Sequence, residues 1–151
     1  MSTTSHRLPR ELAESTSFLL KKLGHKAKEQ AMDAYEEAGF TPYHHAVLAL
    51  LDESSRETQG AIADALGYDR GQLVGILDEL EERGLVERRR DPEDRRRHIV
   101  RLTPEGKRAL TTVRKLSKQL DQDFLGSLSD EDREALHALL AKLAEVHLPT
   151  Y

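Results

Sequence analysis

A run of arginines is the feature of this chain with the clearest chemical potential. Residues 83–101 contain eight arginines and four acidic residues, whereas the rest of the chain contains 15 basic and 23 acidic residues. The whole chain has a net charge of −4, although this stretch carries +4. Guanidinium groups bind phosphates through their charge and their planar fork of donors. The stretch is therefore predicted to contact a polyanion; the alternative is a solvated loop neutralised by Asp91, Glu93 and Asp94.

The residues around this run predict a β-hairpin that carries it. Leu85–Arg89 and His98–Leu102 are two short strand candidates. Asp91-Pro92 lies between them and is typical of a turn, because proline cannot donate to a central strand. The arginines are therefore expected on and around the tip of the hairpin.

Two short helices precede the hairpin. Thr58 is a suitable N-cap for a helix over Gln59–Leu66, which Gly67 ends. Asp69 caps the next helix, and Gln72 is spaced to return a hydrogen bond in a capping box. Two short helices joined by a tight turn predict a helix-turn-helix, and the hairpin that follows makes it a winged helix.

Longer helices flank this unit. The apolar periodicity predicts one helix over Leu12–Ala38 and a second from Thr41-Pro42, followed by a polar connection at residues 52–57. After the hairpin, Thr103-Pro104 opens a helix, and Ser129 with the acids after it opens another.

The predicted fold is mainly α with a small β-hairpin wing. Residues 41–103 form a winged helix-turn-helix, and residues 1–38 and 104–151 form a helical dimerisation region interwoven with it. The flanking helices carry more apolar surface than one small core can cover. A second copy of the chain is therefore expected to pair with them.

Composition excludes several classes of protein. The chain has no cysteine, which excludes a disulfide scaffold, a cysteine zinc site and a thiol redox sensor. Its longest apolar run, Ala46–Leu51, is far shorter than the roughly 20 residues that cross a bilayer. Met1–Arg10 has no apolar stretch of the signal-peptide type. We therefore expect a cytoplasmic protein without a membrane partner.

Catalytic and metal-binding motifs are also missing from the sequence. It contains no nucleophile elbow, no glycine-rich phosphate loop and no evident pair of acid and base carboxylates. None of the 7 histidines has the His-x-x-x-His or His-Glu-x-x-His spacing. We therefore expect no enzyme, no metal site and no cofactor.

From Thr58 to Gly106 the chain resembles the winged-helix core of the multiple-antibiotic-resistance repressor (MarR) family. The stretches that carry the resemblance are Gln59–Gly67, Leu80–Arg88, Asp91–Arg96 and Leu102–Gly106. Asp94 and Arg96 match the family's Asp-x-Arg wing motif. The flanking helices also match, so the resemblance covers nearly the whole chain.

The resemblance implies a homodimeric transcriptional regulator, usually a repressor. Such a protein binds a pseudo-palindromic operator in double-stranded DNA through two half-sites about one helical turn apart. A small aromatic or anionic effector releases it. A protein-interaction module with weak or no DNA binding is the alternative, because the second half of the helix after Asp69 is acidic.

The resemblance places the DNA contacts at the start of the first short helix, in the helix after Asp69 and in the loop of the hairpin. The predicted DNA-binding residues are Thr58, Gln59, Arg70, Gly71, Gln72, Gly75, Arg95, Arg96 and Arg97. Arg70 suits guanine and Gln72 suits adenine, although Gln72 could serve as a cap alone. Asp94 is expected to orient an arginine, because phosphate repels a carboxylate. Gly75 either allows close approach to DNA or is an unfavourable helix glycine.

An effector cleft is expected between the dimerisation helices and the winged helix. Its candidate lining residues are Phe18, His25, Phe40, Tyr43 and His44, because aromatic faces and imidazoles suit an aromatic or anionic ligand. The alternative is that the aromatic residues belong to the ordinary core and the histidines to the surface.

Overall fold

Five helices begin at the caps that the sequence predicts. Thr41, Thr58, Asp69, Thr103 and Ser129 have extended backbone angles, and each side-chain oxygen accepts from the backbone N–H three residues later. Each cap satisfies a donor that the first helical turn leaves without an intrahelical partner. Local chemistry therefore decides where these helices start.

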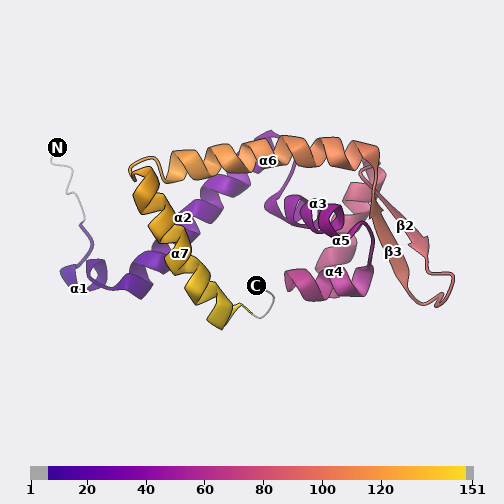
Figure 1. The fold of residues 1–151 in the computed structure, drawn as a ribbon, viewed down its shortest axis with the longest axis horizontal. Helices are drawn as coiled ribbons and strands as arrows, with labels where there is room; N and C mark the ends of the chain where they lie inside the picture. Colours follow the sequence, from indigo (N-terminus) through magenta and orange to yellow (C-terminus); the bar gives the residue numbers. More distant parts are fainter. Residues whose placement is uncertain (1–6, 149–151) are drawn as a thin grey trace, which may run out of the picture.

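The computed structural model describes residues 7–148 (Figure 1). Its helices are α1 (Arg10–Ala13), α2 (Thr16–Glu37), α3 (Pro42–Ser54), α4 (Gln59–Leu66), α5 (Arg70–Glu82), α6 (Pro104–Phe124) and α7 (Asp130–His147). Its strands are β1 (Glu57–Thr58), β2 (Val86–Arg90) and β3 (His98–Leu102). They form one antiparallel sheet in the order β1-β3-β2. The fold is therefore mainly α with a small β wing, as predicted.

The hydrophobic core lies between helices α3 to α6 and the inner face of the sheet. The largest side chains that are fully buried include Leu48, Leu51, Ile62, Leu73, Leu77, Leu80, Val100, Leu110 and Val113. Gly67 joins α4 to α5 with φ of 67°, a left-handed conformation that glycine adopts without strain. This core holds the helix-turn-helix of α4 and α5 against the wing.

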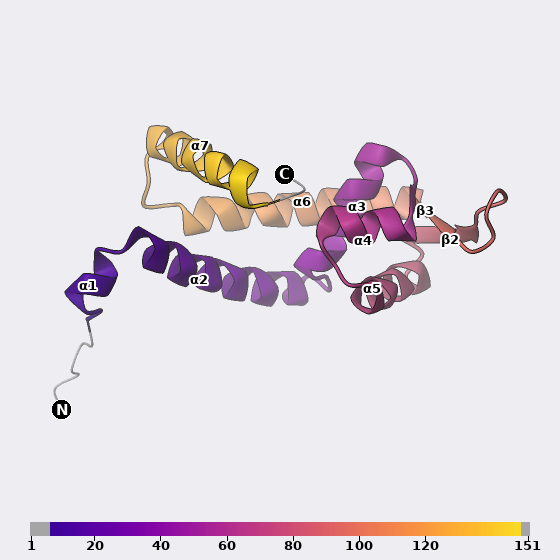
Figure 2. The same ribbon diagram turned by 90° about the horizontal axis from the view of Figure 1, so that it is seen from below.

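Helices α1, α2 and α7 and the outer half of α6 form an arm on one side of this body (Figure 2). Helix α7 has no buried residue. The large apolar side chains exposed on α2 and α7 are Leu19, Leu20, Leu23, Leu139, Leu140, Leu143 and Val146. No helix within residues 7–148 has the length and hydrophobicity that crossing a bilayer requires. The arm thus presents apolar surface that one chain leaves uncovered.

The single helix predicted over Leu12–Ala38 is wrong at its start. The structure ends α1 at Ala13 and begins α2 at Thr16. Ser15 between them has extended backbone angles, and its side chain accepts from the backbone N–H of Phe18. The serine hydroxyl offers the backbone a local partner and so starts a new helix.

Two further local predictions are wrong. Helix α3 continues through Ser54 into the predicted connection, and Ser54 Oγ donates to the carbonyl of Leu50 at 2.9 Å. Glu57, the last residue of the connection, forms β1 together with Thr58, so the wing has three strands rather than two. The reciprocal capping box predicted at Asp69 and Gln72 is also wrong. Among the described residues the reciprocal box forms at Thr41 and His44, while Asp69 only accepts.

Candidate nucleic-acid interface

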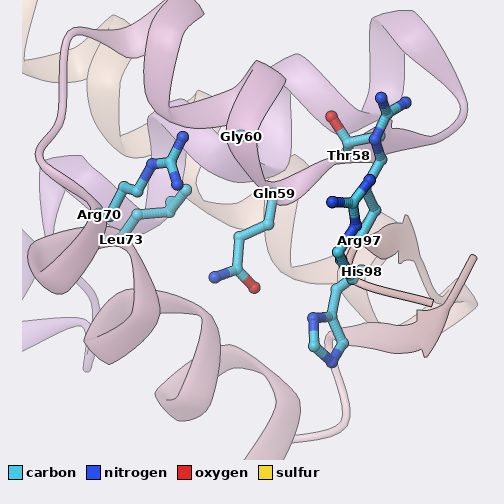
Figure 3. Close-up of a pocket in the computed structure, with 8 residues that line it drawn as sticks. Thr58, Gln59, Gly60, Arg70, Leu73, Arg97 and His98 are labelled. Atoms are coloured by element: carbon cyan, nitrogen blue, oxygen red, sulfur yellow. The ribbon is translucent and has the colours of Figure 1, made fainter. Parts of the chain in front are cut away.

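A hollow of about 260 Å³ collects residues from α4, α5 and the wing. Its lining residues are Thr58, Gln59, Gly60, Arg70, Leu73, Arg96, Arg97 and His98. In Figure 3 the Gln59 side chain lies between Arg70 on one side and Arg97 with His98 on the other. Five of the predicted DNA-binding residues, taken from three separate segments, therefore share one polar surface.

Helix α5 exposes all four of its predicted DNA-binding residues to solvent. Its inward face consists of Leu73, Ile76, Leu77 and Leu80. This helical spacing leaves the opposite face exposed. The predicted residues on the exposed face are Arg70, Gly71, Gln72 and Gly75. Arg95, also exposed, lies outside the helix in the loop between β2 and β3.

Asp94 organises the loop of the wing. Its Oδ1 accepts from the backbone N–H of Arg96 at 3.1 Å and from Arg96 Nε at 3.2 Å. Arg97 Nε lies 3.4 Å from the other carboxylate oxygen. The side-chain hydrogen bond from Arg96, followed by its backbone N–H, lowers the pKa of Asp94. Asp94 thus holds the backbone N–H and Nε of Arg96, while the Arg96 side chain remains 91% exposed.

Most acids of α5 have partners within the protein. Arg88 of β2 pairs with Asp78 and with Glu81, whose Oε1 is 3.0 Å from Arg88 Nη2. The hydrogen bond from the Arg88 side chain is the main reason why the pKa of Glu81 is lowered. His44 Nε2 lies 2.7 Å from Glu79 Oε2. Arg88 therefore offsets part of the negative charge of this helix, and His44 gives Glu79 a hydrogen-bond partner.

Charge counting missed the position of Arg88. This side chain is only 17% exposed, because Arg88 lies opposite buried Val100 in the sheet and points to the inner face. It belongs to the junction between α5 and the wing and not to the surface offered to DNA. The alternation of the strand is the signal that could have revealed this.

Comparison with known proteins identifies the family. The sequence model of the MarR family matches residues 38–97. Transcriptional regulator HosA of Escherichia coli O111:H- is 33% identical over 109 residues, which cover 72% of this chain and 81% of HosA. The chain belongs to the MarR family. A putative transcriptional regulatory protein for the hcr operon of Thauera aromatica is 37% identical over 105 residues, 70% of this chain and 63% of that protein.

Solved structures of MarR-family proteins have the same fold. The transcriptional repressor CouR bound to a 23-mer DNA duplex is 36% identical, with a TM-score of 0.81 and coverage of 93% of this chain and 99% of that one. A MarR-family regulator from Rhodococcus sp. RHA1 is 28% identical, with a TM-score of 0.79 and coverage of 95% and 99%. These relatives are transcriptional regulators and not enzymes. They also do not favour the alternative of a protein-interaction module.

The residues predicted to line an effector cleft lie in two places in this MarR-family chain. Phe18, half-buried, and His25, exposed, lie along α2. At 1.5 Å per residue, about 18 Å of helix separates His25 from the end of α2. Phe40, Tyr43 and His44 lie at and after the turn into α3. One chain therefore does not bring all five residues together.

Phe40 and His44 connect the start of α3 to α5. Arg83, just after α5, lies over the Phe40 ring at 4.3 Å, and its Nη1 donates to the carbonyl of Gly39 at 2.6 Å. His44 Nδ1 accepts from the N–H of Thr41 at 3.1 Å while its Nε2 faces Glu79. The turn between α2 and α3 is therefore in direct contact with Glu79 of α5 and with Arg83 just after it.

His45 predicts a pH dependence of stability. Burial, and secondly the charge of Arg114, lower its pKa below the ordinary value of 6.5. Burial raises the pKa of Tyr35, whose hydroxyl lies 2.7 Å from His45 Nδ1, so the protonated phenol donates to the neutral ring. Below pH 6.5 the unfolded chain takes up a proton that the folded chain resists. The free energy of unfolding therefore decreases as the pH is lowered.

The His45→Phe variant should lose this part of the pH dependence. Its unfolding midpoint is expected to fall less than that of the natural protein between about pH 7 and pH 5. Thermal unfolding across this range measures the difference. His137→Gln at an exposed position of α7 is the matched control, and it should follow the natural protein. Identical profiles for His45→Phe and the natural protein would contradict the assignment.

Gly75→Ala should raise stability and weaken DNA binding. A Cβ at Gly75 would meet nothing within 4 Å, and among the described glycines Gly75 is not one of those with positive φ. Packing therefore gives no reason for a glycine, which costs roughly 1 kcal/mol against alanine in a helix. Thermal unfolding should show a higher midpoint, and a DNA titration a lower affinity. Unchanged affinity would show that close approach to DNA does not require this glycine.

Proposed function

We propose that this MarR-family protein is a homodimeric repressor that binds a pseudo-palindromic operator in double-stranded DNA. The observation that carries the proposal is the hollow where Gln59, Arg70 and Arg96 meet beside the exposed face of α5. A helix fits the major groove, and arginine beside it suits the adjacent minor groove or backbone. A regulator of this kind would act in the cytoplasm.

The contacts divide into base readers and phosphate binders. Arg70 and Gln72 are proposed to read base edges, arginine at guanine and glutamine at adenine. Among the described residues Gln72 donates its backbone N–H to Asp69, and its side chain returns no capping bond. That supports the role in base reading. Thr58, Gln59, Gly71 and the wing arginines Arg95, Arg96 and Arg97 are proposed to position the protein on the backbone.

The arm supports pairing of two copies. Its exposed leucines on α2 and α7 form apolar surface of the kind that an obligate partner covers. We propose that residues 1–38 and 104–151 form the dimerisation region and 41–103 the DNA-binding region. Residues 1–6 and 149–151 of this assignment lie outside the described residues. A two-fold pair would present two α5 helices to two half-sites.

A small aromatic or anionic molecule is the proposed effector. CouR from Rhodococcus jostii RHA1, 28% identical with a TM-score of 0.76, has been solved bound to p-coumaroyl-CoA. An aromatic acid or its CoA thioester is therefore the first class to test. Phe40, Tyr43 and His44 would contact it from one chain. Phe18 and His25 take part in this proposal only as residues of the second copy.

Selection of genomic DNA fragments by the purified protein tests the function. We expect enrichment of a palindromic sequence, and release of that sequence by a member of the effector class. Solution mass measured in parallel should be that of a dimer. Absence of binding to double-stranded DNA at very low ionic strength, without effector, would overturn the proposal.

A further inference from the structure

The outer face of the wing carries arginines that the proposed operator contacts do not use. A hollow of about 220 Å³ on this face is lined by Arg56, Glu87, Arg89, Arg90, Pro92, Ile99 and Arg101. None of these residues lines the hollow that contains Gln59 and Arg70. The wing therefore has two differently placed arginine surfaces.

The sheet register explains why Arg89 and Arg101 face outward, whereas Arg90, opposite His98, lines the hollow from the end of β2. Glu87 lies opposite Arg101, and Arg89 lies opposite Ile99. Residues directly opposite each other in an antiparallel pair share one face. The inner positions are instead held by buried Val86 and Val100.

The third strand extends the same surface. Glu57 lies opposite Val100, so Arg56, one residue earlier, falls opposite Arg101 on the outer face. Residues contributed by or next to all three strands therefore form one surface, which we call the outer wing face: Arg56, Glu87, Arg89, Arg90, Ile99 and Arg101.

The charge of the outer wing face is mostly uncompensated. It holds four arginines and one acid. Arg89 Nη2 lies 3.7 Å from Glu87 Oε2, with both side chains exposed. Within residues 7–148, Arg56, Arg90 and Arg101 form no salt bridge. Arg88 of the same hairpin, by contrast, is paired with two acids.

The place of the wing in the molecule indicates what this face meets. The wing lies at the end opposite the arm through which two copies are proposed to pair (Figure 1). With α5 in the major groove and the wing beside it, the hollow with Arg70 faces the operator. The outer wing face shares no lining residue with that hollow, so the operator contacts leave it available for duplex beyond the half-site. Phosphates are the anions that every DNA sequence offers there.

We propose that the outer wing face binds phosphates of DNA that flanks the operator. This inference rests on the proposed DNA-binding function and extends it. The contact is independent of sequence, since arginines that meet only the backbone read no base. It would lengthen the bound segment of DNA and raise affinity for an operator embedded in longer duplex.

Duplex length is the variable that tests the proposal. One probe is the minimal duplex that spans the two half-sites found by selection. The other adds about one helical turn, roughly 10 base pairs, of unrelated sequence at each end. The natural protein should bind the longer probe severalfold more tightly at low salt. The slope of log affinity against log salt should steepen by about 0.9 for each additional phosphate that the protein neutralises.

The Arg101→Ala variant should remove much of this length dependence. A dimer of the variant lacks two arginines, so the extra slope on the longer probe should shrink by about 1.8. Affinity for the minimal probe should stay within about twofold of the natural protein. Arg56→Ala should behave in the same way. Arg108→Ala, which removes the same charge from an exposed position of α6, is the matched control and should keep the length dependence.

The outcomes separate this proposal from the proposed function. Equal affinity of the natural protein for both probes would overturn the flanking contact, whatever the variants do. So would an equal loss of affinity on both probes in Arg101→Ala, which would place Arg101 on the operator itself. Failure of the natural protein to bind either probe would instead overturn the DNA-binding function and this proposal together.

Discussion

Gly106→Ala should strongly destabilise this protein. A Cβ at Gly106 would lie 2.1 Å from the carbonyl oxygen of Leu85 and 2.6 Å from Leu102 Cδ1. No real Cβ tolerates a backbone oxygen at that distance, so the start of α6 or the segment before β2 would have to move. The free energy of unfolding is expected to fall by about 3 kcal/mol or more, the upper range for overpacking.

Hydrogen bonds fix both sides of this contact and prevent easy relief. The N–H of Thr103 donates to the Leu85 carbonyl at 3.1 Å. Thr103 Oγ1 donates to the carbonyl of Gly84 at 2.7 Å and accepts from the N–H of Gly106 at 3.0 Å. Moving α6 away would break buried bonds, and a buried group left without a partner costs about 1–3 kcal/mol.

Chemical denaturation measures the expected loss. Gly75→Ala is the matched control, because the same change is made in a helix with nothing within 4 Å. The control should unfold at a denaturant concentration equal to or above that of the natural protein. If Gly106→Ala unfolds together with the control, the close approach of α6 to Leu85 is not present in solution.

The sequence predicts best what a few neighbouring residues decide. The caps at Thr58, Asp69 and Thr103 need only a side-chain oxygen and a backbone N–H three residues away. The prediction at Ser15 is wrong for a reason that is equally local. Apolar periodicity continues through this position, so the pattern shows one helix where the hydroxyl begins another.

Pairs that form across the fold could not be predicted from spacing. His44 meets Glu79 across 35 positions of the chain, and Arg88 reaches back to Asp78. The charge pattern of the sequence places Arg88 in a basic surface and the α5 acids in an acidic one. Packing of β2 against α5 brings Arg88 next to Asp78 and Glu81, so that one positive charge offsets part of the negative charge of α5. The candidate DNA surface therefore has fewer free arginines than the sequence suggests. In return, α5 repels DNA phosphates less than its acids alone would.

The strand β1 also could not be predicted from a sequence pattern. Two residues, Glu57 and Thr58, are too few to show alternation. They form a strand because β3 offers them a free edge, with Glu57 opposite Val100. The strand has a consequence for function, since it places Thr58 and Gln59 beside the wing.

Arg96→Ala should weaken binding to every DNA sequence by a similar factor. Arg96 is 91% exposed and held by Asp94 at the wing, where it would meet phosphates or the narrow minor groove. A charge-assisted hydrogen bond contributes about 1.5 kcal/mol or more. Removing it from both copies of a dimer should therefore reduce affinity on the order of a hundredfold. The salt slope should decrease by about 2, because each copy would neutralise one phosphate fewer.

Titration of operator and unrelated duplex at several salt concentrations measures both effects. Arg108→Ala again removes one exposed positive charge per chain elsewhere, and it should leave the slope nearly unchanged. Normal affinity and normal salt slope in Arg96→Ala would remove the wing from the mechanism.

Asp94→Ala separates orientation from charge, because the two effects have opposite signs. Removing a carboxylate makes each chain more positive, and charge alone would then tighten binding to DNA. Asp94 also accepts from Arg96 at two donors and pairs with Arg97, so its loss frees both arginines to take many conformations. Ordering them again on DNA costs about 1–2 kcal/mol for each long side chain. We expect the loss of orientation to exceed the gain in charge, so that Asp94→Ala binds the operator more weakly. Tighter binding by Asp94→Ala in the same titration would show that the carboxylate only reduces the charge of the wing.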